Sequence, residues 1–393
     1  MKGADNMKIF HTADWHLGKI VHNVSMLEDQ KYVLQQLVQD VKEQQPDVVI
    51  IAGDLYDRSI PQVEAVQLLN DVLHEMVVNL NTPVLAIAGN HDSATRIEYG
   101  SGLMKKAGLY KAGTLTANIE PVILHDAEGE VHFYLVPFAE PTVVRQVFED
   151  ESVTTYDGAM RKVIEHIEAK MDKTKRNVLI GHAFVTKDGE KAENTSDSER
   201  RLTVGGTECI DSKMFEAFDY VALGHLHQAH FVRTEKIQYA GSPLKYSESE
   251  VTHKKCYLQV ELRAGELKVE KRLFAPLRDM RIVKGTIEEM LTWPISEDYV
   301  FVELANEGFV KSAVEQVRTV FPNVLHVQRA DIKNQLTEQS SRVKRTSMKD
   351  EELFDQFYEA MTGQQPDEMT KQLFEEALQQ LLDAEREKQG VTS

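Results

Sequence analysis

A chain of 393 residues is too long for one ordinary domain, and a hydrophobic content of 42% can fill the cores of two or three. The formal net charge of −18 argues against an independent, high-affinity nucleic-acid binder, because phosphate contacts require Lys and Arg side chains. Cys209 and Cys256 give no disulfide framework, and no apolar run approaches the length of a membrane span. We therefore expect a cytoplasmic protein.

The first two thirds of the chain alternate between predicted strands and helices. Helices are predicted at 25–45, where Ser25 and Glu28 have the spacing of a capping box, at 61–80, and near 157–171. The polar stretch 186–200 is expected to be a mobile loop. Apolar, β-branched runs predict strands at 7–14, 47–54, 83–92, 131–138, 177–184, 220–227, 236–243 and 256–262. This order favours an α/β fold over residues 7–276, either a mixed sheet or a four-layer α/β/β/α domain.

After residue 276 the pattern starts again on a smaller scale. Three short strands and two helices predict a separate α+β domain at 277–330. Residues 331–349 are polar and show no periodicity, which is typical of a linker. Residues 350–390 contain two amphipathic helices, separated by the sequence GQQPD.

Polar side chains recur where the predicted strands of the first domain end. Ligands of open α/β sheets bind beside the carboxyl ends of strands. Residues at i and i+2 of an extended segment point the same way, so Asp14 with His16, and His225 with His227, can each offer two side chains to one site. Taken singly, each motif is more easily explained as a turn cap or a core histidine than as a functional site. The motifs are DWH at 14–16, GDLYD at 53–57, GNHD at 89–92, GH at 181–182 and GHLH at 224–227.

The five motifs together predict a metal site. They deliver carboxylate, amide and imidazole groups, which suit Mn²⁺, Fe²⁺ or Zn²⁺. No cysteine accompanies them, and this disfavours a thiolate zinc site. Asp54 is then a metal ligand rather than a plain turn residue.

The same five motifs resemble those of the calcineurin-like metallophosphoesterases. The longer segments HTADWHLGK, GDLYDR, AGNHDS and YAGSPLKYS are similar to DNA-nuclease members of that family. The resemblance covers residues 7–330 well and the tail more loosely. It implies a four-layer α/β/β/α metallophosphoesterase domain at 7–276, a small capping domain at 277–330 that recognises DNA, and C-terminal helices at 350–390.

The resemblance also implies a centre of two Mn²⁺ ions, or of another divalent metal. Paired cations about 3.5–4 Å apart clamp an in-line phosphoryl displacement, and one carboxylate can bridge both. That bridge is expected at Asp54. One ion would be held by Asp14, His16, Asp54 and His227, and the other by Asp54, Asn90, His182 and His225.

Three further residues of these motifs receive separate expectations. His91 resembles the catalytic histidine of the family, which contacts the scissile phosphate and protonates the departing 3′ oxygen. Asp92 is expected to orient His91, and a turn cap remains open for it. Some relatives have a second phosphate-contacting histidine where this chain has Asp57, an anion that would repel phosphate unless paired, for instance with Arg58. Asp57 is therefore left out of the catalytic set.

The tail has apolar faces that must be buried somewhere. Docking on the chain's own domain is one reading. The resemblance implies another, in which the helices bind the base of the coiled coil of an ATPase partner, which would also supply much of the DNA-binding surface. The residues expected at that contact are Leu353, Phe354, Phe357, Tyr358, Phe374 and Leu378.

On this resemblance the expected function is a metal-dependent DNA nuclease subunit in double-strand-break repair, recombination and replication. It would cleave DNA ends and hairpins as a 3′–5′ double-strand exonuclease and single-strand endonuclease, as a homodimer within a heterotetramer with the ATPase. The alternative is a small-molecule phosphodiesterase or phosphatase on the same core, which would need neither residues 277–330 nor the apolar tail. A scaffold without metals is disfavoured, because all the ligand positions and His91 are present.

Overall fold

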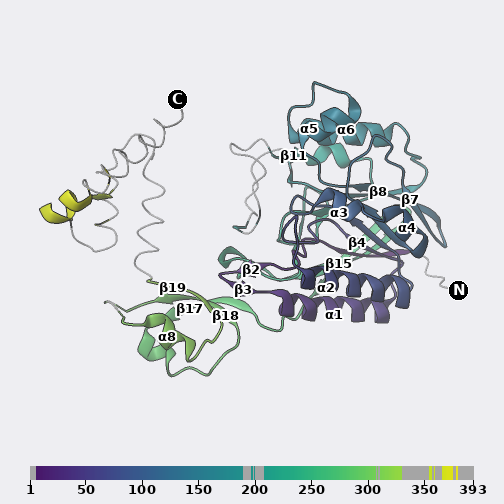
Figure 1. The fold of residues 1–393 in the computed structure, drawn as a ribbon. Helices are drawn as coiled ribbons and strands as arrows, with labels where there is room; N and C mark the ends of the chain where they lie inside the picture. Colours follow the sequence, from purple (N-terminus) through teal and green to yellow (C-terminus); the bar gives the residue numbers. More distant parts are fainter. Residues whose placement is uncertain are drawn as a thin grey trace. The chain divides into compact units, whose positions relative to one another are not determined.

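The computed structural model describes residues 6–188, 196–197, 199, 208–306, 308, 310–329, 354–355, 358, 365–374 and 378. The chain divides into two compact units, Met1–Arg281 and Ile282–Ser393, which are taken in turn (Figure 1). None of the described helices has the length and hydrophobicity that a bilayer crossing requires.

Two six-stranded sheets form the centre of the first unit. In the first sheet β1, β4, β5 and β6 run parallel, and the hairpin β15–β16 joins antiparallel beside β1. Its order is β16 (Glu266–Leu273), β15 (Cys256–Arg263), β1 (Met7–Thr12), β4 (Val48–Ile51), β5 (Val84–Ile87) and β6 (Leu109–Ala112). The second sheet has the order β13 (His230–Phe231), β14 (Ile237–Tyr239), β12 (Tyr220–Gly224), β9 (Arg176–His182), β8 (Gly129–Val136) and β7 (Val122–Asp126).

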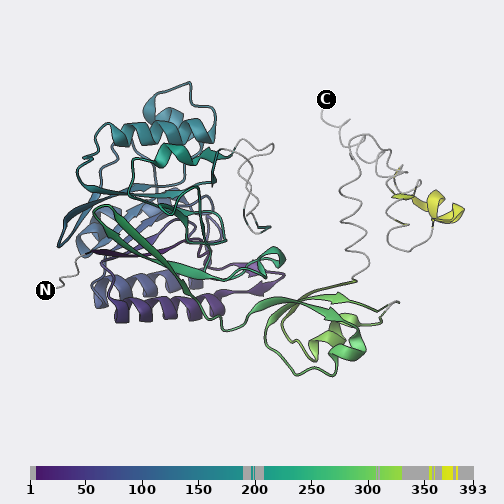
Figure 2. The same cartoon turned by 180° about the vertical axis from the view of Figure 1, so that it is seen from behind.

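The two sheets pack face to face, and helices cover their outer faces. Ile9 and Ile50 of the first sheet share a buried core with Val178 and Ala222 of the second. On the outer side of the second sheet, α5 (Pro141–Phe148) and α6 (Tyr156–Glu168) bury side chains against it. Helices α1 (Leu27–Gln44) and α2 (Val63–His74) lie on the opposite side of the strands in both views (Figures 1 and 2). The first unit is thus the four-layer α/β/β/α arrangement.

The short elements of the first unit lie in its loops. They include the hairpin β2–β3, the paired strands β10–β11 and several single helical turns. Their bounds are β2 (Ile20–Val21), β3 (Val24–Ser25), β10 (Val185–Thr186), β11 (Ile210–Asp211), α3 (Ala94–Glu98), α4 (Ser101–Met104), η1 (Glu75–Asn79), η2 (Lys105–Ala107), η3 (Ser212–Phe215) and η4 (Glu248–Glu250).

The predicted capping box at the start of the first helix is wrong. Helix α1 begins at Leu27 with Met26 as its N-cap residue, and no side chain caps it. Ser25 belongs instead to the hairpin β2–β3, and Glu28 forms an ion pair with Arg278 at 2.9 Å. Ser25 Oγ accepts instead from the backbone amide of Leu27, at 3.4 Å, and not from the amide of Glu28 that a capping box requires.

The second unit contains a three-stranded sheet with its own apolar core. The sheet has the order β17 (Met280–Gly285), β18 (Tyr299–Leu304) and β19 (Val324–Arg329), with β18 and β19 parallel. Helix α7 (Ile287–Met290) begins with a capping box between Thr286 and Glu289, and α8 (Ala313–Arg318) follows β18. The predicted linker at 331–349 lies outside the described residues, and so does most of 350–390.

A few described residues of the tail lie against one another. The rings of Phe354 and Phe374 stack with centroids 4.0 Å apart and an interplanar angle of 8°. Tyr358 is tilted against Phe354 at 5.9 Å, and Lys371 forms an ion pair with Asp355 at 2.7 Å. Leu353 and Phe357, two of the residues predicted to bind the partner, lie outside the described part.

Candidate metal centre

The candidate ligands lie in the loops that follow β1, β4, β5 and β12 and at the end of β9. Strand β1 ends at Thr12 and β12 at Gly224, before their polar residues, whereas His182 is the last residue of β9. Asp14, His16 and Asp54 have left-handed backbones, with φ of 53°, 46° and 49°, and φ of His225 is 107°. The expectation that these pairs share a side through extended geometry is therefore wrong. The loop backbones orient these side chains instead, and their left-handed conformations carry the strain that is common at functional sites.

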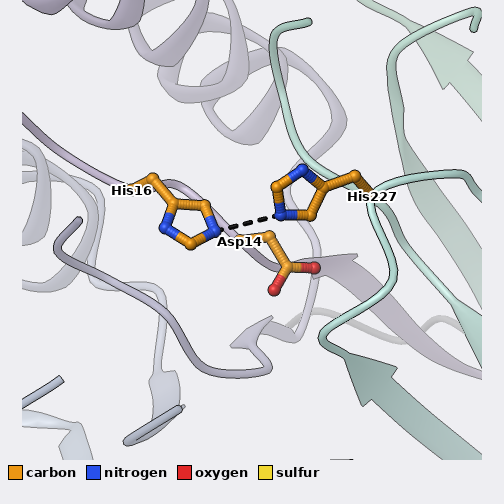
Figure 3. A group of neighbouring side chains, drawn as sticks. All are labelled: Asp14, His16 and His227. Atoms are coloured by element: carbon orange, nitrogen blue, oxygen red, sulfur yellow. Dashed lines mark hydrogen bonds between the residues drawn. The ribbon is translucent and has the colours of Figure 1, made fainter. Parts of the chain in front are cut away.

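Three of the predicted ligands form a first donor group. Asp14, His16 and His227 each place one ligand atom within 4.8 Å of the others (Figure 3). The imidazole Nε2 atoms of His16 and His227 are 3.1 Å apart. All three side chains are buried, although each is polar or ionisable. Buried polar groups need hydrogen-bond partners, and buried charges need a partner of opposite charge or a metal ion.

A second donor group lies beside the first. His182 Nε2 is 2.9 Å from Asn90 Oδ1 and 3.4 Å from Asp54 Oδ2, and His225 Nδ1 is 3.1 Å from Asn90 Oδ1. Asp54 Oδ2 is also 3.6 Å from His16 Nε2. Asp54 is therefore adjacent to both groups, the position that a bridging carboxylate occupies. The structure brings all seven predicted ligands together, and their binding of metal stays a prediction.

The orientation of the imidazoles fits divalent cations. His182 Nδ1–H donates to the carbonyl oxygen of Ala52 at 2.9 Å, and His227 Nδ1–H donates to Glu250 Oε1 at 3.0 Å. Each of these two histidines therefore directs Nε2, the atom that carries the lone pair of the neutral ring, into the cluster. Acceptor atoms about 3 Å apart repel one another unless a proton or a cation lies between them. The donor set, imidazole with carboxylate and amide oxygen, suits Mn²⁺, Fe²⁺ or Zn²⁺.

The electrostatics of the cluster favour exchange of protons for metal. Burial raises the pKa of Asp14 to about 7. Burial lowers the pKa of His182, but the charge of Asp54 and its hydrogen bond outweigh burial and hold that pKa at about 9. Near neutral pH with no cation bound, His182 therefore holds a proton and Asp14 is partly protonated. A divalent cation replaces those protons, which makes its binding stronger as the pH rises.

Glycines beside the ligands allow the loops to approach one another. A Cβ atom on Gly53 would lie 2.2 Å from His182 Nδ1, and one on Gly89 would lie 2.2 Å from Asp54 Oδ1. At Gly224 it would lie 1.9 Å from the carbonyl oxygen of Ala52. The glycine that precedes the ligand in the second, third and fifth motifs is thus required by close packing.

His91 lies at the edge of the cluster, where its ring can face a substrate. Its backbone amide donates to Asp54 Oδ1 at 2.8 Å, and its Nδ1–H donates to the carbonyl oxygen of Asp57 at 2.9 Å. Its Nε2 atom is therefore the one available for proton transfer. The ring of His91 packs edge-on against His16, with centroids 4.7 Å apart.

Asp92 and Asp57 have contacts that refine their predicted roles. The Asp92 carboxylate accepts from the backbone amides of Leu55, Tyr56 and Gly89 at 2.9–3.0 Å, so it joins two ligand loops in the manner of a turn cap rather than contacting the His91 ring. The anion at Asp57 is paired mainly with Lys19, at 2.8 Å, and more loosely with Arg58, at 3.6 Å.

Several residues that hold the ligands were missed at the level of sequence. Glu250 accepts from His227 and is paired with Lys255, and Glu199 Oε1 accepts from the backbone amide of His227 at 2.7 Å. Gln30 Nε2 donates to the carbonyl oxygens of Trp15 and His16. None of these residues lies in a strand-end motif. Glu199 falls within the stretch 186–200, expected to be a mobile loop, most of which lies outside the described residues.

The fold and the cluster define a class of enzyme. Two packed sheets carry imidazole and carboxylate donors at the carboxyl ends of five strands, which is the arrangement of a metal-dependent phosphoesterase. The profile of the calcineurin-like phosphoesterases matches residues 7–229, which include all seven predicted ligands. A second profile, the type 5 capsule protein repressor C-terminal domain, matches residues 276–362.

Two similar proteins indicate which family of phosphoesterases the chain belongs to. The SbcD subunit of the SbcCD nuclease from Staphylococcus epidermidis is 35% identical over 384 residues, 96% of this chain and 100% of that protein. The same subunit from Staphylococcus saprophyticus is 34% identical over 364 residues, 91% of this chain and 94% of that protein. The chain belongs to the SbcD family of calcineurin-like phosphoesterases. It is therefore a metal-dependent, hydrolytic phosphodiesterase of the nuclease class.

Among solved structures, a dimetal phosphatase from Danio rerio is 12% identical with a TM-score of 0.40, covering 68% of this chain and 96% of that one.

Proposed function

We propose that the protein is the DNA nuclease subunit of an assembly with an SbcC-type coiled-coil ATPase, acting in double-strand-break repair, recombination and replication. The observation that carries the proposal is the position of Asp54, adjacent to both donor groups and hydrogen-bonded to the backbone of His91. This arrangement joins a site for two cations to a proton donor, which suits in-line cleavage of a phosphodiester. The proposed activities are 3′–5′ exonuclease on duplex ends and endonuclease on single strands and hairpins.

The chain's own residues have distinct parts in this proposal. Asp14, His16, Asp54 and His227 would hold one Mn²⁺, and Asp54, Asn90, His182 and His225 the other. When bound, the cations supply positive charge for the oxygens of the scissile phosphate. His91, anchored through Nδ1 to the Asp57 carbonyl, presents Nε2 to the departing 3′ oxygen and protonates it. Asp92 fixes the two loops that carry Asp54 and Asn90.

A cleavage assay tests the proposal. The purified chain with Mn²⁺ should cleave a DNA hairpin, and addition of the ATPase with ATP should stimulate processing of duplex ends. His91→Asn, which keeps the ligands, is the matched inactive control. Efficient hydrolysis of small phosphodiesters with no cleavage of DNA, with or without the ATPase, would favour the small-molecule phosphodiesterase instead.

The described tail residues support a contact with the ATPase. The ring of Phe354 packs against both Tyr358 and Phe374, so these three side chains connect the two described segments of the tail. Met369 and Leu373 are 72% and 58% exposed, and apolar side chains so exposed suit the apolar face of a partner helix. We place the coiled-coil contact on this segment, together with Leu353, Phe357 and Leu378.

A substitution of Leu373 tests that contact. Leu373→Glu should weaken co-purification with the ATPase at least tenfold, because a carboxylate in an apolar groove loses its hydration. Gln372→Glu adds the same charge beside it and serves as the control. Metal-dependent cleavage of single-stranded DNA should be unchanged in both variants. Unaltered binding of Leu373→Glu would place the contact elsewhere.

Three further parts complete the proposal. Exposed apolar side chains around α2–α4, namely Ile60, Val63, Val66, Tyr99 and Leu103, support a homodimer within a heterotetramer with the ATPase. The domain at 277–330 is proposed to recognise DNA, with 331–349 as a linker to the tail helices at 350–390. Cytoplasmic location is proposed because the DNA substrate of a bacterial nuclease lies there.

A further inference from the structure

Glu250 is a buried carboxylate beside one of the candidate metal ligands. It ends the short turn η4, 23 positions after His227, and its side chain is fully buried. Its Oε1 accepts from His227 Nδ1–H at 3.0 Å and from the Ser196 hydroxyl at 3.2 Å. The carboxylate is therefore held in contact with the imidazole, on the side away from the cluster.

Lys255 fixes this carboxylate and the backbone of the ligand together. Its ammonium group forms an ion pair with Glu250 Oε2 and also donates to the carbonyl oxygen of His227 at 2.9 Å and to Ser242 Oγ at 2.8 Å. Buried ion pairs commonly contribute little net stability, because desolvation offsets their attraction. What the pair determines here is the orientation of His227, held at its ring through Glu250 and at its backbone through Lys255.

The two donor groups differ in what lies behind their imidazoles. In the first group, His227 is backed by the Glu250 carboxylate, and the buried Nδ1 of His16 faces Asp57 Oδ1 at 3.8 Å. In the second group, His182 Nδ1–H donates to the neutral carbonyl of Ala52 at 2.9 Å, and the Asp14 carboxylate lies beyond hydrogen-bond distance of that atom, at 3.9 Å. A carboxylate behind a ligating histidine makes the imidazole a stronger donor and fixes its tautomer.

We propose that Glu250, held by Lys255, is a positioning residue that makes the Asp14–His16–His227 group the tighter of the two cation sites, so that it fills first. The inference rests on the proposed two-cation centre. Glu250 lies outside the residues matched to the phosphoesterase profile, which end at 229. Its direct contact with a candidate ligand is the hydrogen bond to the ring of His227.

A manganese titration of the full-length chain tests the proposal. Free Mn²⁺ is measured by electron paramagnetic resonance as the ion is added to protein freed of metal, which gives a dissociation constant for each site. In Glu250→Gln the tighter site should weaken about 10–100-fold while the weaker site is unchanged, because loss of a backing carboxylate typically has that effect. Asn90→Ala should give the reverse pattern, since Asn90 contacts only His182 and His225 among the candidate ligands.

Two variants control for folding and for charge. Glu250→Gln leaves Lys255 buried without its anion, so the double variant Glu250→Gln/Lys255→Met, which removes both charges, is measured beside it and should show the same site-selective loss. Glu270→Gln removes a half-exposed carboxylate of β16 and should alter neither constant.

The outcomes separate this proposal from the one on which it rests. If the wild-type chain binds fewer than two Mn²⁺ ions, the two-cation centre itself is wrong. If it binds two and the Glu250 variants leave both constants unchanged, or weaken both equally, the centre stands and the positioning role of Glu250 is overturned.

Discussion

The two units of the chain differ in what they bury. Among the described residues, the first unit encloses many ionisable groups, including Asp14, Asp54, Glu250 and Lys255, whereas Glu303 is the buried charged residue of the second. The core of the second unit is otherwise aliphatic and aromatic. Buried charges cost free energy unless they are paired, so a concentration of them in one unit indicates a functional site there. Substitutions of the clustered ionisable groups of the first unit should therefore affect catalysis, and substitutions in the core of the second unit should affect stability.

The largest expected effect is at Asp54. Asp54→Asn should abolish hydrolysis and lower the occupancy of both cations, because its carboxylate is adjacent to both donor groups. Asp57→Asn is the matched control and should still bind two ions at saturating Mn²⁺, because the Asp57 carboxylate is paired with Lys19 and is not among the seven predicted ligands. Metal analysis by mass spectrometry measures this. Two ions bound to the Asp54 variant at wild-type affinity would remove Asp54 from the bridging position.

His91 should separate chemistry from metal binding within the first unit. His91→Asn is expected to lower the cleavage rate about 10²–10⁴-fold, the usual contribution of a positioned proton donor. Metal content and DNA affinity should match wild type, because the ring is anchored to the Asp57 carbonyl outside the ligand set. Single-turnover cleavage and a binding assay give the two numbers. Loss of metal from this variant would mean that His91 is a ligand.

His11 tests how burial in the first unit affects stability. Burial lowers its pKa to about 3, and its ring links the sheets by donating from Nε2–H to the Leu223 carbonyl and accepting from the Tyr220 hydroxyl. His11 takes up a proton near pH 6.5 in the unfolded chain but stays neutral down to about pH 3 in the folded chain. The contribution of neutral His11 to the free energy of unfolding is therefore fully present above pH 6.5 and is lost as the pH falls towards 3. The loss should be about 3 kcal/mol at pH 4.

The matched variant for that test is His11→Gln, whose amide can donate and accept in the same way without titrating. Urea unfolding of both proteins in chelator, at pH 7 and pH 4, measures the difference. The wild type should lose more stability than the variant between the two pH values. Equal losses would show that His11 is not the acid-sensitive group.

The smallest effect is expected in the second unit. Val302 is fully buried in the core around β18, and Val302→Ala should destabilise that unit by about 2 kcal/mol through the loss of two methyl groups and the cavity that they leave. Hydrogen exchange should accelerate in β17–β19 and stay unchanged in β1 and β4. Hydrolysis of a small phosphodiester should match wild type. A loss of that activity would remove the distinction between the two units.

Much of the first unit could be predicted from its sequence. Five of its strands, β1, β4, β5, β9 and β12, are apolar runs with a polar motif at the carboxyl end, and that shared position is enough to predict a common site. The orientation of the ligand side chains could not be predicted in the same way. Asp14 and His16 sit in left-handed backbone, a conformation that tertiary contacts impose on residues other than glycine.

The residues that hold the ligands in place could not be predicted from the sequence either. Glu250 and Lys255 belong to no motif, and they reach His227 only because η4 and β15 fold back beside the loop after β12. A long-range contact of this kind leaves no periodic signal in one chain. Ser25 and Glu28 show the opposite error, since a local pattern typical of a capping box is overridden by the hairpin β2–β3.

The central claim is a pair of cations joined by Asp54. Anomalous X-ray scattering from crystals grown with Mn²⁺ tests it most directly. The account predicts two peaks about 3.5–4 Å apart on either side of the Asp54 carboxylate, one near His16 and His227 and the other near His182 and His225. A single peak at saturating Mn²⁺, or two peaks that do not share Asp54, would contradict it.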